Sequence, residues 1–380
     1  MNRILAAIRR QHCRLPILLL ALAGAGCAPQ AMLGYRPEAP ISANLPLGAA
    51  GVRDARAAFA PLFERELRAF DASADAAAWL HTGPAAQRDV SMALEEIDRR
   101  FDERRVQTVV LVVPGLLGDC VDDQSVPFGD GVLRTRELES TASYAQYADL
   151  GLRDIRLLWV PGRASVEANG ARLAAALREV AARDGVAHIV LVAYSKGTPD
   201  VLHALRLLEA DGGVPRQIAA LVSVAGIVMG TPLADHYETL YASLSPLLSP
   251  FGCTAAAGGE VASLTRRERA DWLAAHPPPP ALAYHSVVAF AAPHETAPFL
   301  RHSQAMLAAI DPRNDGQVVA ADALLPGSAL IAAARADHWS LALPLERNPH
   351  ALVRAVAPSR TFPRAPLFRA LVKWVVGTLP

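Results

Sequence analysis

The sequence predicts an α/β fold built on a mostly parallel β-sheet that is flanked by helices. Short apolar runs rich in valine, leucine and isoleucine alternate with longer segments in which apolar residues recur at helical spacing. The runs are apolar at consecutive positions, as strands are when helices cover both faces of their sheet. Because strands that alternate with helices form parallel sheets with right-handed crossovers, this order predicts the fold class.

Length and composition exclude several classes of protein. The chain has 380 residues, of which 52% are hydrophobic, which suits one large domain with additional segments or two domains. Its 37 basic residues match its 37 acidic residues, so we expect no nucleic acid partner. No cluster of cysteines and histidines has the spacing of a zinc site. We interpret Asp119 and Asp122 as part of a solvated acidic loop and expect no metal.

The amino terminus has the layout of a secretory signal over residues 1–26. Basic residues precede the apolar run 15–22, which is too short for a permanent membrane span. The small residues before Cys27 resemble the lipobox of bacterial lipoproteins, in which this cysteine becomes the lipidated first residue, although Gly24 stands where leucine is usual. Ala28 resembles the next residue of lipoproteins sent to the outer membrane. We therefore expect an exported protein, anchored at the periplasmic face of the outer membrane or else cleaved nearby and secreted.

Two cysteines remain once Cys13 has left with the signal and Cys27 has been reserved for lipid. Cys120 and Cys253 form an even pair in an oxidising compartment, where disulfides persist. They either form a disulfide or stay as two buried thiols, and the sequence leaves both alternatives open.

The remaining chain divides into three parts. Residues 27–50 are rich in alanine, proline and glycine and indicate a tether. Residues 51–105 carry apolar residues at helical spacing and form an N-terminal helical lead, with His81 expected in a surface loop. Residues 106–380 form the α/β domain.

The expected elements follow from the apolar runs and the turn residues between them. The expected strands are 106–113, 155–160, 186–194, 218–224, 283–290 and 329–334. The expected helices are 52–70, 85–105, 166–182, 198–208, 299–310 and 367–376. The alternation stops at about 236–280, and this apolar insertion is either a cap or lid over a site or a packing decoration.

One of these strands ends in a serine. Ser195 lies at a strand-to-helix corner, because Thr198-Pro199-Asp200 suits the first turn of a helix. Such a corner holds the serine in a strained backbone geometry that requires small neighbours, and it lifts the hydroxyl clear of the sheet. Ala193 and Gly197 are the small neighbours. Ser195 is therefore a candidate nucleophile, and the alternative is a helix-capping serine.

A glycine-rich turn, Pro114-Gly115-Leu116, follows the first core strand. Such a turn can present backbone N–H groups to a developing negative oxygen, although taken alone it is only a tight turn. We expect the N–H groups of Leu116 and Lys196 to form an oxyanion-binding pair, with the Lys196 side chain turned to solvent.

An acid and a base follow the serine along the chain. Asp315 and His338 each lie past the C-terminal end of a strand, at the edge where Ser195 emerges. Acyl transfer by serine needs a base that accepts the hydroxyl proton and a carboxylate that orients this base. Asp311 and Asp337 are competing acids, but Asp311 precedes a proline and Asp337 adjoins the histidine in sequence. We also expect His188 and His285 within strands, and His236 and His294 as candidate pocket residues beside the insertion.

From about Val106 to the C-terminus, the chain resembles the serine esterases and lipases of the α/β-hydrolase fold. The order serine, acid, histidine is the order of that family. Asn314-Asp315-Gly316 resembles its acid loop, and Gly230-Thr231-Pro232 resembles its turn after the strand beyond the nucleophile. The chain departs from the family by having Ala193 for the first glycine of Gly-x-Ser-x-Gly and Pro114 for a histidine.

This resemblance implies Ser195 as nucleophile, His338 as general base and then acid, and Asp315 as orienting carboxylate. It also implies an ester or lipid substrate and no cofactor. The sequence thus predicts a serine hydrolase of carboxylic esters that acts through an acyl-serine intermediate. Two alternatives stay open, an acyltransferase that uses the same triad and a non-catalytic envelope scaffold of the same fold.

Overall fold

A computed structural model represents the protein. It describes residues 44–81, 94–116, 124–129, 132–133, 142–237, 259–348, 351–355, 357 and 360–380. The signal segment, most of the tether, residues 238–258 of the insertion and all four cysteines lie outside the described residues. The predictions for lipidation at Cys27 and for pairing of Cys120 with Cys253 therefore stay predictions.

Seven strands in the described ranges form one sheet in which every pair of neighbours is parallel. In spatial order they are β1 (Arg53–Asp54), β9 (Ala329–Ala334), β8 (Ala283–Ala289), β7 (Ile218–Val224), β6 (His188–Tyr194), β2 (Thr108–Val113) and β5 (Asp154–Leu157). Two further strands, β3 (Gln124–Ser125) and β4 (Val132–Leu133), form a separate antiparallel pair. The predicted parallel sheet is confirmed.

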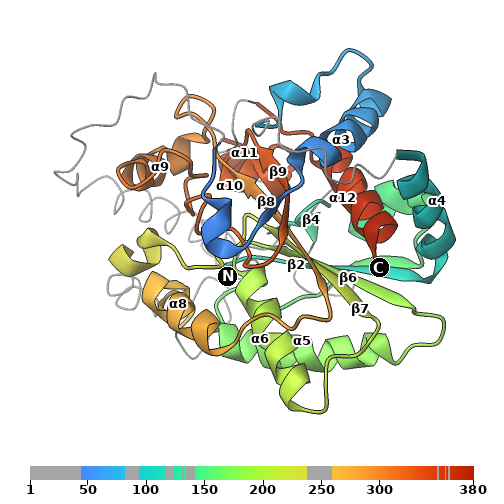
Figure 1. Ribbon diagram of the computed structural model, residues 1–380. Coiled ribbons are helices and arrows are strands. Elements are labelled where there is room, and N and C mark those ends of the chain that lie inside the picture. Colours follow the sequence, from blue (N-terminus) through green and yellow to red (C-terminus); the bar gives the residue numbers. More distant parts are fainter. Residues whose placement is uncertain are drawn as a thin grey trace, which may run out of the picture.

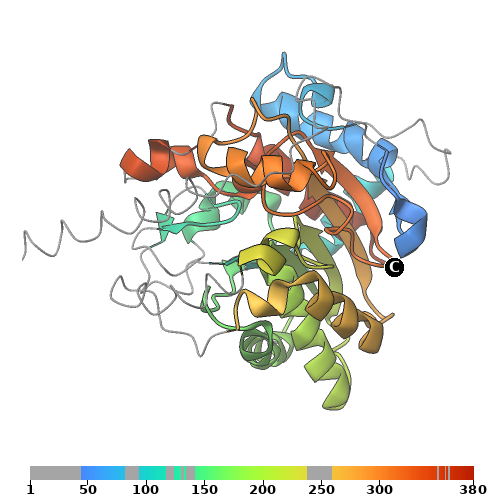
Figure 2. The same cartoon turned by 90° about the vertical axis from the view of Figure 1, so that its left-hand side faces the viewer.

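Helices cover both faces of this sheet (Figures 1 and 2). On one face lie α5 (Val166–Ala181), α6 (Gly197–Ala210) and α8 (Arg266–Ala275). On the other face lie α3 (Arg56–Phe70), α4 (Leu94–Arg104) and α12 (Arg364–Thr378). Further α-helices in the described ranges are α9 (Arg301–Ala308), α10 (His338–Ala342) and α11 (Ala351–Ala355). Short 3-10 helices are η1 (Leu47–Ala50), η2 (Ala76–Ala78), η3 (Arg105–Gln107), η4 (Ala142–Leu150), η6 (Ala262–Leu264), η7 (Pro298–Leu300) and η8 (Leu345–Arg347).

The central strands are apolar on both faces because each face meets a helical layer. In β6, Val190 and Val192 belong to the core shared with α3, α4 and α12, whereas Ile189 and Leu191 belong to the core shared with α5 and α6. All four side chains are fully buried. Alternate residues of a strand point to opposite faces, so a strand that is covered twice needs an uninterrupted apolar run.

The order in which successive strands are added to the sheet changes direction at β2. The next sheet strand along the chain, β5, lies on one side of β2, whereas β6, β7, β8 and β9 follow one another on the other side. In open α/β sheets, ligands bind in the crevice outside the carboxyl ends of the strands at such a switch point. The carboxyl ends of β2 and β6 carry the glycine-rich turn and Ser195, so the candidate site lies at this point.

The N-terminal lead differs from its prediction at its start. The expected helix over 52–70 begins only at Arg56, because Arg53–Asp54 pairs with β9 as an edge strand of the sheet. The backbone N–H of Arg53 donates to the Ser328 carbonyl at 3.0 Å. Two residues are too few for a strand period to be recognised in the sequence.

The described part of the insertion packs against the body of the protein. Leu273 of α8 is buried in the core beside α5 and α6, and the Arg269 guanidinium donates to the Val228 carbonyl at 3.2 Å. A lid or cap role concerns chiefly residues 238–258 and stays a prediction. Among the described helices, none is long and apolar enough to cross a membrane.

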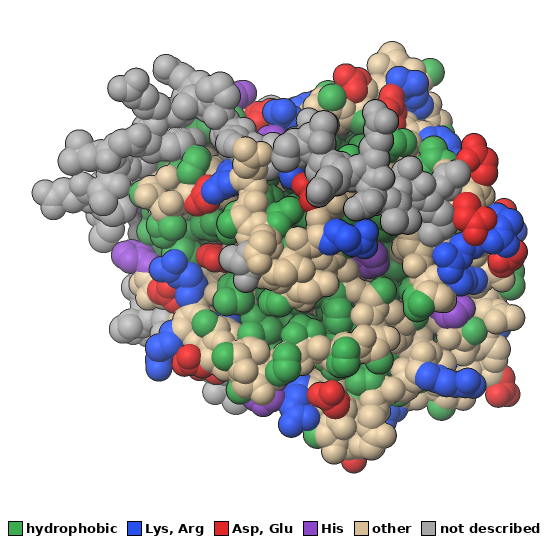
Figure 3. Space-filling model, viewed as in Figure 1, with side chains coloured by type: hydrophobic (Ala, Val, Ile, Leu, Met, Phe, Trp, Pro, Cys, Tyr) green, Lys and Arg blue, Asp and Glu red, His purple; other side chains and the backbone are tan. Residues whose placement is uncertain are grey.

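On the face that Figure 3 shows, the described residues carry charged side chains of both signs. Figure 3 shows basic and acidic side chains interspersed on the face that is turned to the viewer. This distribution agrees with the balanced composition of 37 basic and 37 acidic residues.

His81 is buried, so its predicted place in a surface loop is wrong. Its side chain stacks on Phe290 with 3.8 Å between ring centroids, and its Nε2 lies 3.0 Å from the Phe290 carbonyl oxygen. Its backbone N–H donates to the Ala333 carbonyl at 2.7 Å. Burial lowers the pKa of His81 to about 4, although the Phe290 carbonyl acts in the opposite direction.

We predict that His81 makes the fold acid-sensitive. Between pH 6.5 and 4 the unfolded chain binds a proton that the folded His81 resists, so the free energy of unfolding falls as the pH is lowered. The loss should approach about 3 kcal/mol per molecule below pH 4. Urea denaturation of the parent and of His81→Gln at pH 7.5 and pH 4.5 measures it.

The pH 7.5 experiment serves as the control for the substitution itself, because His81 is neutral in both states there. The free energy of unfolding should fall less between pH 7.5 and pH 4.5 in His81→Gln than in the parent. An equal fall would show that other groups, such as buried His285 with its pKa also lowered to about 4, carry the whole effect.

Candidate active site

Ser195 has a left-handed backbone conformation, with a φ of 55°. This region is unfavourable for a residue with a side chain, and it persists only where the surroundings fix it. The Ser195 N–H donates to the Val224 carbonyl at 3.0 Å, and the Ser195 carbonyl accepts from the N–H groups of Thr198 at 3.1 Å and Ile227 at 3.3 Å. The backbone of the corner is therefore held at three points.

Glycines let the end of β2 approach this corner. A Cβ atom on Gly197 would lie 2.7 Å from both the Val113 and Pro114 carbonyl oxygens. A Cβ atom on Gly115 would lie 2.9 Å from Ser195 Cβ and 3.2 Å from Ser195 Oγ. Both glycines are required by these close approaches, which bring the glycine-rich turn against the serine.

The structure brings Ser195, His338 and Asp315 together in a buried hydrogen-bonded chain. His338 Nε2 lies 2.8 Å from Ser195 Oγ, and His338 Nδ1 lies 2.6 Å from Asp315 Oδ2. Their exposed fractions are 4% for Ser195, 4% for His338 and 1% for Asp315. Since the carboxylate accepts the Nδ1 proton, Nε2 is left as the acceptor of the serine hydroxyl.

The loop around Asp315 orients its carboxylate. Oδ1 accepts the backbone N–H groups of Gln317 and Val318, each at 2.8 Å, which leaves Oδ2 for the histidine. The Asp315 carbonyl also accepts the backbone N–H of His338 at 2.8 Å. Both the ring and the backbone of the histidine are therefore held by the same residue.

The two competing acids have other partners. Asp311 binds the Arg313 guanidinium at 2.6 Å. Asp337 caps α10 by accepting the N–H groups of Trp339 at 3.0 Å and Ser340 at 2.8 Å, and it also accepts the Ala297 N–H at 2.7 Å. Burial raises the pKa of Asp337. Neither acid hydrogen-bonds to the imidazole of residue 338.

Tyr194 contacts the histidine, and the sequence did not predict this contact. Its hydroxyl donates to the His338 carbonyl at 2.8 Å, and the two rings lie 5.1 Å apart. Burial raises the pKa of Tyr194, so the hydroxyl keeps its proton. Its place directly before the serine was the only signal in the sequence.

The expected oxyanion-binding amides belong to residues that lie at the site. Leu116 follows Gly115, which touches Ser195, and Lys196 follows the serine directly. Within the part of the chain that the structure describes, neither the Leu116 N–H nor the Lys196 N–H donates a hydrogen bond. Their role as donors to a substrate oxygen stays a prediction.

The Lys196 side chain does not reach solvent, so this part of its prediction is wrong. It is 1% exposed, and its ammonium group donates to both carboxylate oxygens of Asp200, at 2.7 and 2.9 Å. The helix that begins at Gly197 places Asp200 one turn beyond the lysine and on the same side of the helix.

The other candidate histidines lie away from this chain of hydrogen bonds. His188 begins β6 and His285 lies within β8, as expected. His236 and His294 are exposed. Asp119 and Asp122 lie outside the described residues, among which no group of three or more potential ligands could hold a metal ion.

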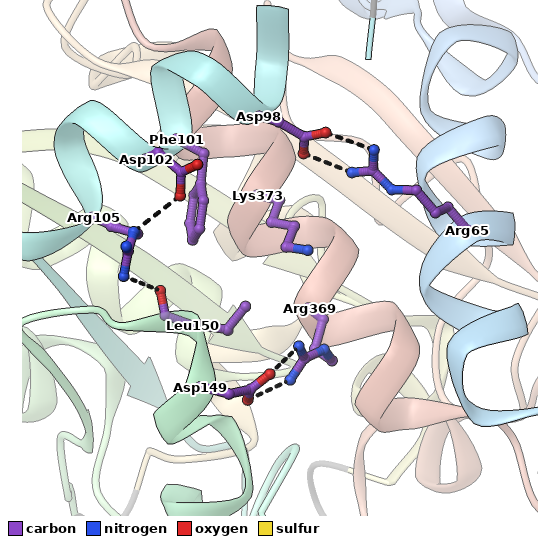
Figure 4. Close-up of a pocket in the computed structure, with 9 residues that line it drawn as sticks. All are labelled: Arg65, Asp98, Phe101, Asp102, Arg105, Asp149, Leu150, Arg369 and Lys373. Carbon is purple, nitrogen blue, oxygen red and sulfur yellow. Dashed lines mark hydrogen bonds and ion pairs between the residues drawn. The ribbon is translucent and has the colours of Figure 1, made fainter. Parts of the chain in front are cut away.

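A charged cavity of about 450 Å³ lies between α3, α4, α12 and η4 (Figure 4). Its cationic groups are paired: Arg65 with Asp98 at 2.6 Å, Arg105 with Asp102 at 3.0 Å and Arg369 with Asp149 at 2.5 Å. Lys373 binds Glu66 at 2.5 Å. None of the three hydrogen-bonded residues of the candidate site lines it, so we assign this cavity a structural role in joining these helices.

Comparison with known proteins identifies similar structures. No family model and no curated protein matched the sequence. The metagenomic carboxyl esterase MGS0156 is 29% identical, with a TM-score of 0.66, over 89% of this chain and 96% of that chain. The mature lipase BlEst2 from Bacillus licheniformis is 20% identical, with a TM-score of 0.47, over 77% of this chain and 97% of that chain. Lipase 1 from Pelosinus fermentans is 13% identical, with a TM-score of 0.48, over 73% of this chain and 100% of that chain. The likeness to MGS0156 supports the α/β-hydrolase fold for this chain.

We predict that Gly197→Ala destabilises the fold. The added methyl group would meet two backbone oxygens at 2.7 Å, which cannot withdraw without moving the end of β2. Overpacking of this kind costs about 1–3 kcal/mol. Urea denaturation measures the loss, with Gly48→Ala as the matched control because a Cβ there has no atom within 4 Å. Equal stability of the two variants would contradict the close packing at this corner.

Proposed function

We propose that this chain is a serine hydrolase of carboxylic esters that acts through an acyl-serine intermediate. The buried hydrogen-bonded chain from Ser195 Oγ through His338 to Asp315 carries the proposal. The likeness to a carboxyl esterase, at 29% identity over most of both chains, supports an ester as the substrate class.

The first half of the proposed reaction forms the acyl-enzyme. Ser195 Oγ attacks the ester carbonyl carbon while its proton passes to His338 Nε2, which lies 2.8 Å away. Asp315 stabilises the imidazolium that forms. The carbonyl oxygen becomes an oxyanion and accepts the N–H groups of Leu116 and Lys196. Collapse of the tetrahedral intermediate then breaks the bond to the alcohol, which takes the proton from Nε2.

The second half releases the acid. Water attacks the acyl carbon and gives a proton to His338 Nε2, and the same two amides stabilise the second oxyanion. Ser195 Oγ leaves as the alcohol and recovers its proton from the histidine. The residues of the chain therefore carry every proton transfer in the cycle.

Two readouts distinguish this proposal from its alternatives. An acyltransferase would pass the acyl group to an added alcohol in preference to water, so the ratio of ester to free acid among the products separates transfer from hydrolysis. A scaffold without activity would form no adduct at Ser195 with a fluorophosphonate probe.

We predict that the three residues contribute unequally to activity. Ser195→Ala and His338→Ala should each abolish ester turnover, and Ser195→Ala should also abolish fluorophosphonate labelling. Asp315→Asn should lower kcat by about 10⁴, because an amide in place of the carboxylate no longer holds the required histidine tautomer. Turnover of a p-nitrophenyl ester, monitored by absorbance, measures all three.

Asp311→Asn is the matched control for Asp315→Asn, because it removes a carboxylate four residues away that binds only Arg313 in the described structure. It should retain the kcat of the parent. Parent-like activity in Asp315→Asn, or a large loss in Asp311→Asn, would contradict the assignment of the acid.

We also propose that the chain is exported and anchored to a membrane through lipid on Cys27. Together with the apolar insertion, this location favours an ester of an apolar acyl group. In a bacterial host, metabolic labelling with an alkyne fatty acid should mark the parent but not Cys27→Ala, which should also leave the membrane fraction. Cys13→Ala is the control and should be labelled like the parent. Labelling of Cys27→Ala would contradict the anchor, and a cleaved, unlabelled parent would indicate plain secretion.

A further inference from the structure

We propose that the buried ion pair between Lys196 and Asp200 positions the Lys196 backbone amide for oxyanion binding. The inference rests on the proposed function and adds a positioning role for two side chains that no step of the reaction uses directly. These side chains act through the peptide between residues 195 and 196, and they do not contact the ester.

The ion pair is completely enclosed. The side chains of Lys196 and Asp200 are each 1% exposed, and the ammonium group donates to both carboxylate oxygens, at 2.7 and 2.9 Å. Lys196 is the N-cap of α6, and Asp200 lies in the first turn of that helix. The lysine side chain therefore runs alongside the first turn and is fixed at its far end.

A third residue connects this pair to the neighbouring helix. Asn169 of α5 is fully buried, and its amide nitrogen donates to Asp200 Oδ2 at 2.8 Å and to the Pro161 carbonyl at 3.1 Å. The carboxylate thus accepts hydrogen bonds from two elements, and it links the start of α6 to α5 and to the loop after β5.

This linkage adds a restraint on the peptide between residues 195 and 196, which contains the Lys196 N–H. The hydrogen bonds that the Ser195 carbonyl accepts from Thr198 and Ile227 hold one end of this planar peptide, and in the described structure the Lys196 N–H at its other end has no acceptor. An oxyanion donor is effective only if it is already aimed at the charge that develops. Anchoring the Lys196 side chain holds the residue that follows this peptide, which limits rotation of the peptide and therefore the direction of its N–H.

Stability alone does not explain why such a pair is buried. The free energy needed to remove two charges from water is about as large as the free energy gained from their attraction. Replacing a buried ion pair by apolar side chains therefore often leaves the stability of the fold unchanged. Burial raises the pKa of Asp200 to about 6 despite the opposing effects of Lys196 and Asn169. Unlike an apolar contact, the ion pair between Lys196 and Asp200 is directional, so it fixes the relative position of the two side chains.

The test is a series of variants whose kinetic constants are normalised to the number of working sites. Asp200→Asn keeps the shape and one acceptor oxygen, whereas Lys196→Met/Asp200→Leu replaces the pair by apolar side chains and keeps the variant foldable. Fluorophosphonate titration counts competent serines, after which kcat and KM for a p-nitrophenyl ester are expressed per titrated site. A trifluoromethyl ketone, which forms a tetrahedral adduct with serine, reports the oxyanion-binding strength directly.

We expect the double variant to lose kcat by about 10–100-fold per titrated site, somewhat less than the loss caused by removing one oxyanion donor. KM should change less than about twofold, because uniform binding of the ground state is not affected. Affinity for the trifluoromethyl ketone should fall by the same factor as kcat, and Asp200→Asn should lie between the double variant and the parent. Glu209→Gln, which removes a carboxylate from the exposed end of the same helix, is the control and should match the parent.

Two results would overturn the inference in distinguishable ways. If kcat per titrated site and ketone affinity stay within about twofold of the parent while fewer sites titrate, the pair only stabilises the fold. If the parent itself neither labels at Ser195 nor turns over esters, the proposed function fails, and the positioning role fails with it.

Discussion

The left-handed backbone at Ser195 is the constraint on which the rest of the site depends. A φ of 55° at a residue with a side chain persists because backbone hydrogen bonds and two glycine contacts leave the corner no other geometry. This one conformation turns a buried strand into a helix and leaves the hydroxyl outside the sheet. The proposed nucleophile and one proposed oxyanion donor therefore belong to consecutive residues of the same turn.

Three nearby carboxylates show how local hydrogen bonds, and not sequence distance, assign chemical roles. Asp315 has one oxygen fixed by two backbone amides and the other facing the histidine. Asp337 adjoins that histidine in sequence, yet both its oxygens are used by backbone N–H groups. Asp200 is bound to the Lys196 ammonium group and the Asn169 amide group. Only the first of these has a lone pair aimed at an imidazole.

Residues placed by strand ends were predictable, whereas residues placed by contacts between distant surfaces were not. Ser195 and His338 follow the ends of parallel strands, and such ends share one edge of a sheet, so chain order indicated that they meet. Lys196 and His81 were predicted to face solvent, because the sequence around them does not reveal the side chains that cover them. The contact of Lys196 with Asp200 had a weak signal, an opposite charge four residues away in a helix.

The edge strand Arg53–Asp54 sets a boundary for any processing of the chain. Its backbone covers the outer side of β9, where the Arg53 N–H donates to the Ser328 carbonyl and the Ala55 N–H donates to the Leu330 carbonyl. A cut after this strand would uncover polar backbone groups along β9, which is how sheets become templates for aggregation. If the chain is anchored through lipid as we propose, a protease that sheds it must therefore act upstream of Arg53, and the released form must carry that strand with it.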